Sequence, residues 1–250
     1  MSDLGLSGKR VIVTGAAGGL GRAFARAFAG AGARVLAADI DLAGARETAG
    51  IIGEAALATG LDLRSGASCA AAVEAAERAF GGVDVLINNA AIYAGLERQP
   101  FEEIDEEVWD SVMAVNARGV WQMSRAALPA LRSAGGGAIV NIASATVFSG
   151  SPHWMHYVAA KGAVIAMSRV MAKELGADGI RVNVLAPGIT MTEASNGLFE
   201  DAKSYGALRA ALGRNAEVDD ITGGALYLAS PLAAFMTGQT LVIDGGKQFI

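Results

Sequence analysis

Cysteine and histidine are scarce in this chain of 250 residues, and their scarcity limits the chemistry that it can support. Cys69 is the only cysteine, so neither an intrachain disulfide nor a metal centre built from several thiolates is possible. The only two histidines, His153 and His156, lie three positions apart, and no further metal ligand is evident near them. We therefore expect no metal ion, and we place both histidines in a pocket wall or on the surface.

An excess of basic residues and a long apolar run are also lacking. The chain has 20 basic and 25 acidic residues and a net charge of −5, which argues against a nucleic-acid-binding protein. No apolar run reaches the roughly eighteen residues of a membrane span. Residues 1–4 begin a polar stretch without the apolar segment of a secretory signal. The expected compartment is therefore the cytoplasm.

Apolar residues and glycine are, in contrast, abundant. Hydrophobic residues make up 52% of the chain, which is enough for a large core. The 33 glycines follow no collagen-like period and so predict tight turns and close backbone contacts. A chain of this length is normal for one α/β domain, and neither a linker nor an internal repeat divides it. We expect a single dinucleotide-binding and catalytic domain over residues 1–250.

Short apolar runs alternate along the chain with longer segments of helical periodicity. The runs predict strands at 11–13, 34–38, 56–59, 83–87, 138–142, 181–185 and 240–243. Helical patterns cover 20–30, 67–80, 105–132, 157–176 and 219–228. This alternation predicts a Rossmann-type, doubly wound α/β fold with seven mostly parallel strands and helices on both faces. The irregular stretch 188–213 is the expected mobile lid over a site.

A glycine-rich turn follows the first predicted strand and opens the first predicted helix. Such a turn lets backbone N–H groups approach a pyrophosphate at a helix N-terminus. A glycine-rich turn without a ligand is the alternative reading of this motif alone, but its place after the first strand favours nucleotide binding. The residues expected to contribute are Gly15, Gly18, Gly19, Leu20 and Gly21.

Asp39 closes the second predicted strand, where a carboxylate can accept both ribose hydroxyls of an adenosine. It would also repel a 2′-phosphate, so we expect NAD in preference to NADP. No basic residue lies between Gly15 and Gly21, and Arg22 is expected on the helix exterior. Asp41 could compete for the ribose, and an ordinary turn carboxylate is the alternative for Asp39.

Tyr157 and Lys161 lie four residues apart, about one helical turn, so their side chains share a helix face. A neighbouring ammonium favours phenolate, so we expect Lys161 to lower the pKa of Tyr157 toward working pH. The hydroxyl of Ser144 could hold a substrate oxygen. A pair with this spacing is commonly an ordinary surface pair, so the chemistry depends on the rest of the chain.

Taken in order, these motifs resemble the short-chain dehydrogenase/reductase family in its compact single-domain branch. The resemblance covers the chain from Leu6 to Gly246. Ala91 stands where the family's N-N-A-G motif ends in glycine, which adds one methyl group near the cofactor. The matching segments are 14–21, 88–91, Asn116, Ser144, Tyr157 with Lys161, 187–192 and 244–246.

The resemblance implies an NAD-dependent oxidoreductase that interconverts a secondary alcohol and its carbonyl by hydride transfer. Tyr157 would exchange the proton, and Ser144 would orient the substrate oxygen. Lys161 would lower the pKa of Tyr157 and bind the nicotinamide ribose, and Asn116 would hold a water in a proton relay. A helix-cap or kink residue is the alternative interpretation of Asn116, because the family's asparagine distorts its helix, but we favour the relay. The implied cofactor contacts, beyond the glycine turn and Asp39, are Ile40, Asp62, Leu63, Asn89, Ala90, Ala91, Tyr157, Lys161, Pro187, Gly188, Ile189, Thr190 and Thr192.

The expected substrate pocket is largely apolar and aromatic. Residues 149–161 are similar to those of family members that act on ring-bearing alcohols, so we expect a small, neutral, hydrophobic cyclic or aryl alcohol. An interface role for Trp154 is nearly as good an interpretation. The expected wall residues are Tyr93, Thr146, Val147, His153 and Trp154.

Two other functions are compatible with the same sequence motifs. A 3-oxoacyl-carrier-protein reductase shares the same motifs, but it would usually prefer NADPH and a basic docking patch. A non-catalytic dinucleotide-binding protein would typically lack the tyrosine or the lysine. The helices at 105–132 and 157–176 carry more apolar surface than one sheet face needs, and family members pair such helices, so we expect a homotetramer, or failing that a homodimer.

Overall fold

A single parallel sheet organises the computed structural model, which describes residues 4–196 and 206–250. Seven strands lie in the order β3-β2-β1-β4-β5-β6-β7, and every neighbouring pair is parallel. The predicted fold class and the position of each predicted strand are confirmed. The strands are β1 Arg10–Thr14, β2 Arg34–Asp39, β3 Ala56–Gly60, β4 Val85–Asn88, β5 Gly137–Ile142, β6 Ile180–Pro187 and β7 Thr240–Ile243.

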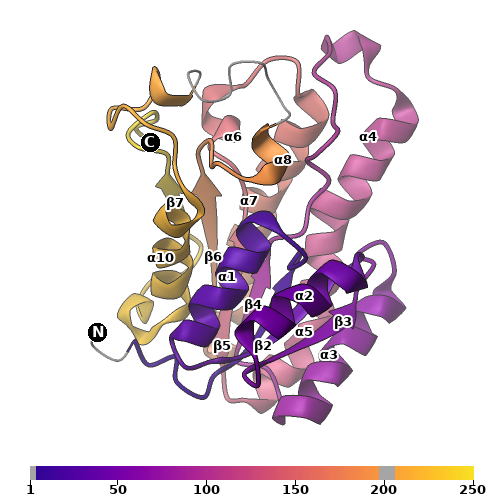
Figure 1. Cartoon of the computed structure of the whole chain (residues 1–250), viewed down its shortest axis with the longest axis vertical. Coiled ribbons are helices and arrows are strands. Elements are labelled where there is room, and N and C mark those ends of the chain that lie inside the picture. The colour runs from indigo at the N-terminus through magenta and orange to yellow at the C-terminus, as the bar shows by residue number, and fades with distance from the viewer. Residues whose placement is uncertain (1–3, 197–205) are drawn as a thin grey trace.

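Helices cover both faces of this sheet, which explains why its strands are apolar on both sides (Figure 1). One face packs against α1 (Gly19–Gly30), α2 (Leu42–Ile52) and α10 (Val218–Ala229). The other packs against α3 (Gly66–Phe80), α5 (Gly119–Ser133) and α7 (Met155–Leu175). Each face has its own buried core, and the aromatic side chains of Phe24 and Phe28 on α1 are fully buried in one of them.

Two features of the helices differ from the sequence prediction. The segment 105–132 is not one regular helix, because a π-helical turn at Ala114–Arg118 separates α4 (Glu106–Met113) from α5. The prediction missed α2, whose N-terminus is capped by the carboxylate of Asp41, which accepts the N–H groups of Ala43 and Gly44 at 3.1 Å. Asp41 therefore caps a helix and is not placed as a competitor of Asp39.

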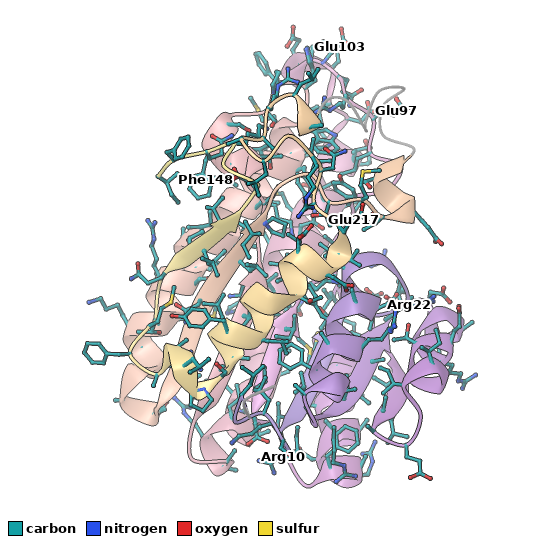
Figure 2. All side chains as sticks on the ribbon, turned by 60° about the vertical axis from the view of Figure 1, so that its left-hand side comes forward. Arg10, Arg22, Glu97, Glu103, Phe148 and Glu217 are labelled. Carbon is teal, nitrogen blue, oxygen red and sulfur yellow. The ribbon has the colours of Figure 1, made fainter. Side chains whose placement is uncertain are left out.

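The carboxyl ends of the strands all point to one end of the molecule. In Figure 1 the arrows of β6 and β7 run upward, toward α6 (Thr146–Ser149) and α8 (Glu193–Asn196). Figure 2 shows Glu97 and Glu103 at that upper end, opposite Arg10 at the start of β1. Loops that follow the strands therefore meet here, as expected for a ligand site on an open parallel sheet.

A buried hydrogen-bond chain ties the middle strands to the helices beneath the site. Asn88 on β4 donates to Asn141 on β5 at 2.8 Å, and Asn141 donates to Ser168 on α7 at 2.8 Å. Asn88 also donates to Ser124 on α5 at 3.0 Å. These hydrogen bonds fix β4, β5 and α7 relative to one another, and these elements lead into the candidate site.

Part of the expected lid, residues 197–205 of 188–213, lies outside the described residues. The described parts of that segment are 188–196, which ends in α8, and 206–213. None of the described helices has the length and apolar character that a membrane crossing needs.

Candidate active site

A cleft of about 570 Å³ lies at the carboxyl end of the sheet. It brings together residues that are far apart in the chain and that come from most motifs of the sequence analysis, although Asn116 and residues 244–246 do not line it. The predicted residues that line it are Gly15, Gly18, Gly19, Leu20, Gly21, Asp39, Ile40, Asp62, Leu63, Asn89, Ala90, Ala91, Tyr93, Ser144, Thr146, Trp154, Tyr157, Lys161, Pro187, Gly188, Ile189, Thr190 and Thr192.

Three predicted residues do not line this cleft. Val147 packs instead against a buried cluster that includes Val164. His153 is exposed and has a positive φ of 64°, so its side chain does not form the pocket wall. Asn116 is fully buried in the π-helical turn, where its amide accepts from the N–H of Ile92 at 2.7 Å and donates to the carbonyl of Ile92 at 2.9 Å. Asn116 therefore braces the loop behind the cleft.

The glycine turn is held by contacts that leave no room for side chains. Gly15 has a φ of +68°, and a Cβ there would lie 2.7 Å from the Cα of Ala90. A Cβ on Gly21 would overlap the carbonyl oxygen of Gly15. The Thr14 hydroxyl accepts the N–H groups of Asn89 and Ala90, each at 3.0 Å, and so joins the turn to the end of β4. Glycine is thus required at positions 15 and 21 by geometry.

The N-terminus of α1 opens into the cleft and is suited to an anion. Its N-cap residue, Gly18, provides no side-chain cap, and the first turn holds no acidic residue. A Cβ on Gly18 would meet nothing within 4 Å, so this side of the turn is open space. Free backbone N–H groups and the positive end of the helix dipole favour a phosphate here. The turn therefore fits the pyrophosphate of a dinucleotide.

Arg22 is turned away from this anion position. Its guanidinium donates to Glu47 on α2 at 2.9 Å, to Thr48 at 3.0 Å and to the carbonyl of Ala17. It therefore lies between α1 and α2 and not on the helix exterior, which corrects the expected position. Arg22 still lies away from the expected cofactor position, because it does not line the cleft.

The carboxylate of Asp39 both supports the glycine turn and lines the cleft. One oxygen accepts the N–H of Ala17 at 2.9 Å, and the other accepts the N–H of Asp41 at 2.9 Å. Each carboxylate oxygen has two acceptor positions, so both can still accept a ribose hydroxyl. Further along this end, Asp62 pairs with Arg64 at 2.9 Å, and this hydrogen bond lowers the pKa of Asp62. Arg64 is a lining cation that the sequence analysis did not anticipate.

The catalytic candidates meet where β5 ends above α7. The Ser144 hydroxyl accepts from the N–H of Thr146 at 3.2 Å and from its hydroxyl at 2.9 Å, and it hydrogen-bonds Tyr157. Lys161 donates to the carbonyl of Ile142 at 2.8 Å, and its Nζ lies 5.7 Å from the ring centre of Tyr157. Only 6% of Tyr157 and 2% of Lys161 are exposed. The structure therefore unites the predicted serine, tyrosine and lysine.

Burial controls the protonation of this group. It lowers the pKa of Lys161 to about 8 and raises the pKa of Tyr157 well above its usual range. The hydrogen bond with Ser144 opposes the rise in the pKa of Tyr157, whereas the nearby Tyr93 adds to it. The expected lowering of the Tyr157 pKa by Lys161 is therefore wrong for the chain by itself, because desolvation of the phenolate outweighs the effect of an ammonium 5.7 Å from the ring.

An aromatic cluster forms the other end of the cleft. The ring centres of Tyr93, Trp154 and Tyr157 lie 5.1 to 5.5 Å from one another. Burial raises the pKa of Tyr93 to about 12, so it remains neutral at working pH. Trp154 is only 3% exposed and lies in the cleft wall, as one of its two interpretations predicted.

Further charged residues line the cleft beside the apolar and aromatic side chains that the sequence predicted. They are Arg98, Glu193 and Lys247. The guanidinium of Arg98 lies over the Trp154 ring at 4.8 Å. Glu193 belongs to the predicted lid segment 188–213, but no sequence signal marked Arg98 or Lys247, because the paths of their segments depend on tertiary packing.

Comparison with known proteins gives full-length matches. A family model described as Enoyl-(Acyl carrier protein) reductase matches residues 15–248. D-threitol dehydrogenase of Mycolicibacterium smegmatis is 38% identical over 98% of this chain and 94% of its own length. Galactitol 2-dehydrogenase of Agrobacterium fabrum is 38% identical over 97% of this chain and 98% of its own. Among solved structures, 3-ketoacyl-(acyl-carrier-protein) reductase of Brucella melitensis complexed with NADH has a TM-score of 0.92 and 37% identity, covering 98% of this chain and 100% of that one.

A glycine turn after β1 and a Ser–Tyr–Lys group at the same edge of a parallel sheet define this chain as an α/β oxidoreductase that uses a nicotinamide dinucleotide. The solved relative shares this architecture over its whole length, and the two dehydrogenases match in sequence over nearly theirs. The chain belongs to the short-chain dehydrogenase/reductase family, as its motifs predicted, and relatives in this family oxidise secondary alcohols or reduce the matching carbonyls.

Proposed function

We propose that this protein is an NAD-dependent dehydrogenase that interconverts a small, ring-bearing secondary alcohol and its ketone. The observation that carries the proposal is the position of Ser144, Tyr157 and Lys161 in the same cleft as the glycine turn. The dinucleotide supplies the hydride acceptor or donor when it is bound. Everything else in the reaction is the work of this chain's own residues.

Each catalytic residue has a role that its surroundings support. Tyr157 holds the proton at its phenol oxygen and exchanges it with the substrate oxygen. Ser144 orients that oxygen, and it lies close enough to Tyr157 to oppose the rise in the pKa of the phenol. Lys161 places a donor beneath the ring of Tyr157 and binds the nicotinamide ribose. Asn116 is the proposed relay residue. Its amide oxygen can accept one more hydrogen bond and its amide nitrogen can donate one more, in addition to the two that each bind Ile92.

In the proposed complex the dinucleotide extends along the cleft, and different residues bind each of its parts. The N-terminus of α1 binds the pyrophosphate and Asp39 binds the adenosine ribose, whose 2′-hydroxyl distinguishes NAD from NADP. Asp62 and Leu63 face the adenine, and residues 187–192 face the nicotinamide. A Cβ on Gly188 would lie 2.8 Å from the Cα of Asp244, so glycine is needed where this loop meets the end of β7.

The preference for a ring rests on the rings of Tyr93, Trp154 and Tyr157, which offer faces and edges at about 5 Å spacing. An open-chain polyol is the second candidate, favoured by the polar lining of Thr146, Ser151 and Arg98 and by the names of two relatives. A panel of aryl alcohols, cyclic alcohols and open-chain polyols, each with NAD or NADP and followed by absorbance of the reduced nicotinamide, tests both. Turnover confined to acyl-thioesters would overturn both candidates.

We also propose that the protein assembles into a homotetramer, with a homodimer as the alternative. Trp121 on α5 is 44% exposed and Val170 on α7 is 56% exposed, which is unusual for such apolar side chains on the helices expected to pair. Light scattering tests the assembly, and a stable monomer would contradict both states.

A further inference from the structure

Two side chains from neighbouring helices hold the backbone of the glycine turn from behind. On α2, the hydroxyl of the fully buried Thr48 donates to the carbonyl of Ala16 at 2.7 Å. On α1, Nη2 of Arg22 donates to the carbonyl of Ala17 at 2.6 Å, and Nε of the same guanidinium donates to the Thr48 hydroxyl at 3.0 Å. Two successive carbonyls of the turn are therefore bound by a connected pair of donors.

The guanidinium of Arg22 is itself fixed by Glu47 on α2. Its Nη1 and Nη2 donate to the two carboxylate oxygens of Glu47 at 3.0 Å and 2.9 Å, so all three of its nitrogens have acceptors. A bidentate pair of this kind sets the plane of the guanidinium as well as its distance. Arg22 does not line the cleft, so it acts on a ligand there through the backbone that it holds.

The peptide bond between Ala17 and Gly18 turns this contact into a direction. It is trans, so the carbonyl of Ala17 and the N–H of Gly18 point in opposite directions from one plane. Arg22 binds the carbonyl on the side of α2, and the N–H therefore points away from α2. Gly18 lines the cleft and Ala17 does not, which agrees with this orientation. Among the described residues no acceptor binds the Gly18 N–H, so it is available to a phosphate oxygen.

The orientation of this peptide depends on Arg22 more than that of the peptide before it. The peptide between Ala16 and Ala17 is held at both ends, because Asp39 accepts its N–H at 2.9 Å and Thr48 binds its carbonyl. In the described part of the chain, Arg22 is the only donor to the carbonyl of Ala17. Glycine follows, and glycine tolerates either sign of φ, so this peptide could rotate at low cost. A rotated peptide would present a carbonyl oxygen to the pyrophosphate and would repel it.

We propose that Arg22 is a positioning residue for the dinucleotide, because it holds the peptide between Ala17 and Gly18 with its N–H directed at the pyrophosphate. Glu47 and Thr48 keep the guanidinium in place. The inference rests on the proposed function, in which the N-terminus of α1 binds the pyrophosphate, and it names the side chain that prepares this site. Its effect is confined to ligands that carry the pyrophosphate.

The test compares two ligands, ADP-ribose, which has the pyrophosphate, and adenosine, which lacks it. In calorimetry, Arg22→Met should weaken ADP-ribose about tenfold, as expected for one lost hydrogen bond to a charged group, and should change the affinity for adenosine less than twofold. Glu47→Gln, which loosens the guanidinium without removing it, should weaken ADP-ribose about threefold and leave adenosine unchanged. Arg26→Met is the matched control, because Arg26 is an exposed arginine on the same helix, and it should change neither affinity.

Salt distinguishes the held peptide from the charge of Arg22 acting at a distance. The ratio of ADP-ribose affinities between wild type and Arg22→Met should be the same in about 0.05 M and about 0.5 M salt, whereas a long-range charge effect would be screened. A ratio that falls to one at high salt would overturn the proposal. So would equal weakening of both ligands, or unchanged ADP-ribose binding in both variants.

Failure of the proposed function has a different result. The wild type would then bind ADP-ribose, with the same dependence on Arg22, and would oxidise no secondary alcohol with NAD. A wild type that binds adenosine but gains no affinity from the pyrophosphate would overturn the positioning role itself.

Discussion

The nucleotide end of the cleft is built from backbone, whereas the substrate end is built from side chains. At the first end, Gly15 and Gly21 let a strand, a turn and a helix approach closely, and the donors are N–H groups of α1. At the second end, Tyr93, Arg98 and Trp154 form the wall, and they come from a loop and a helix entry. Backbone geometry is set by local sequence, but a wall of side chains depends on how distant segments pack. One end can therefore serve a shared cofactor while the other is free to change with the substrate.

The largest expected effect separates the chemistry of the substrate end from binding at the nucleotide end. Tyr157→Phe removes only the proton-carrying hydroxyl, so kcat should fall about 1000-fold. The dissociation constant for NADH should change by less than about threefold, because the ring stays packed on Trp154 and Tyr93. Single-turnover kinetics and NADH fluorescence titration measure the two quantities. Unchanged turnover would refute the mechanism.

The second effect breaks the nucleotide end. Gly21→Ala forces a methyl group into the carbonyl of Gly15, so the free energy of unfolding should fall by about 3 kcal/mol and dinucleotide binding should weaken with it. Gly30→Ala is the control on the same helix, because a Cβ there meets nothing within 4 Å. It should leave binding intact and stabilise the fold by about 0.5 kcal/mol. Urea unfolding of both variants makes the comparison, and equal effects would show that the close approach does not matter.

The same contrast decides what the sequence could predict. Strand ends and glycine turns are local features, so the positions of Asp39 and Ser144 followed from the order of apolar runs, and that of Tyr157 from its helical spacing to Lys161. The sequence could not predict that Arg98 lies at the cleft. Its contact with Trp154, which lies 56 residues later in the chain, depends on how the loop that carries Arg98 packs on α7. The direction of the Tyr157 pKa shift was also missed, since spacing reveals a neighbouring charge but not the loss of solvent. α2 was overlooked because two glycines, Gly44 and Gly50, interrupt its helical pattern.

A third effect concerns the substrate end alone, through the burial of Lys161. Its pKa is about 8 in the folded chain and about 10.4 in an unfolded one. Between these values the unfolded chain binds more protons, so the free energy of unfolding should rise with pH, by up to about 3 kcal/mol from pH 7 to pH 10. The cost of the buried ammonium is fully present below pH 8 and is relieved as the pH rises.

Lys161→Met isolates this contribution, because all other titrating groups remain. The wild type should therefore gain stability relative to the variant as the pH rises toward 10. Any advantage that the variant has at pH 7 should shrink or reverse. Chemical denaturation at pH 7, pH 8.5 and about pH 10 measures it. A pH-independent difference would mean that Lys161 is solvated, and the low pKa would be wrong.

The smallest effect tests whether a side chain also matters at the end built from backbone. Asp39→Asn keeps an oxygen to accept the N–H of Ala17 but removes the charge that would repel a 2′-phosphate. The preference for NAD over NADP, measured as the ratio of kcat/KM values, should therefore fall about tenfold, equivalent to about 1.4 kcal/mol. Asp41→Asn is the matched control, because that carboxylate caps α2, and it should leave the ratio unchanged. If both variants kept the wild-type ratio, the side chain of Asp39 would not select the dinucleotide. The nucleotide end of the cleft would then bind and select its ligand through the backbone alone.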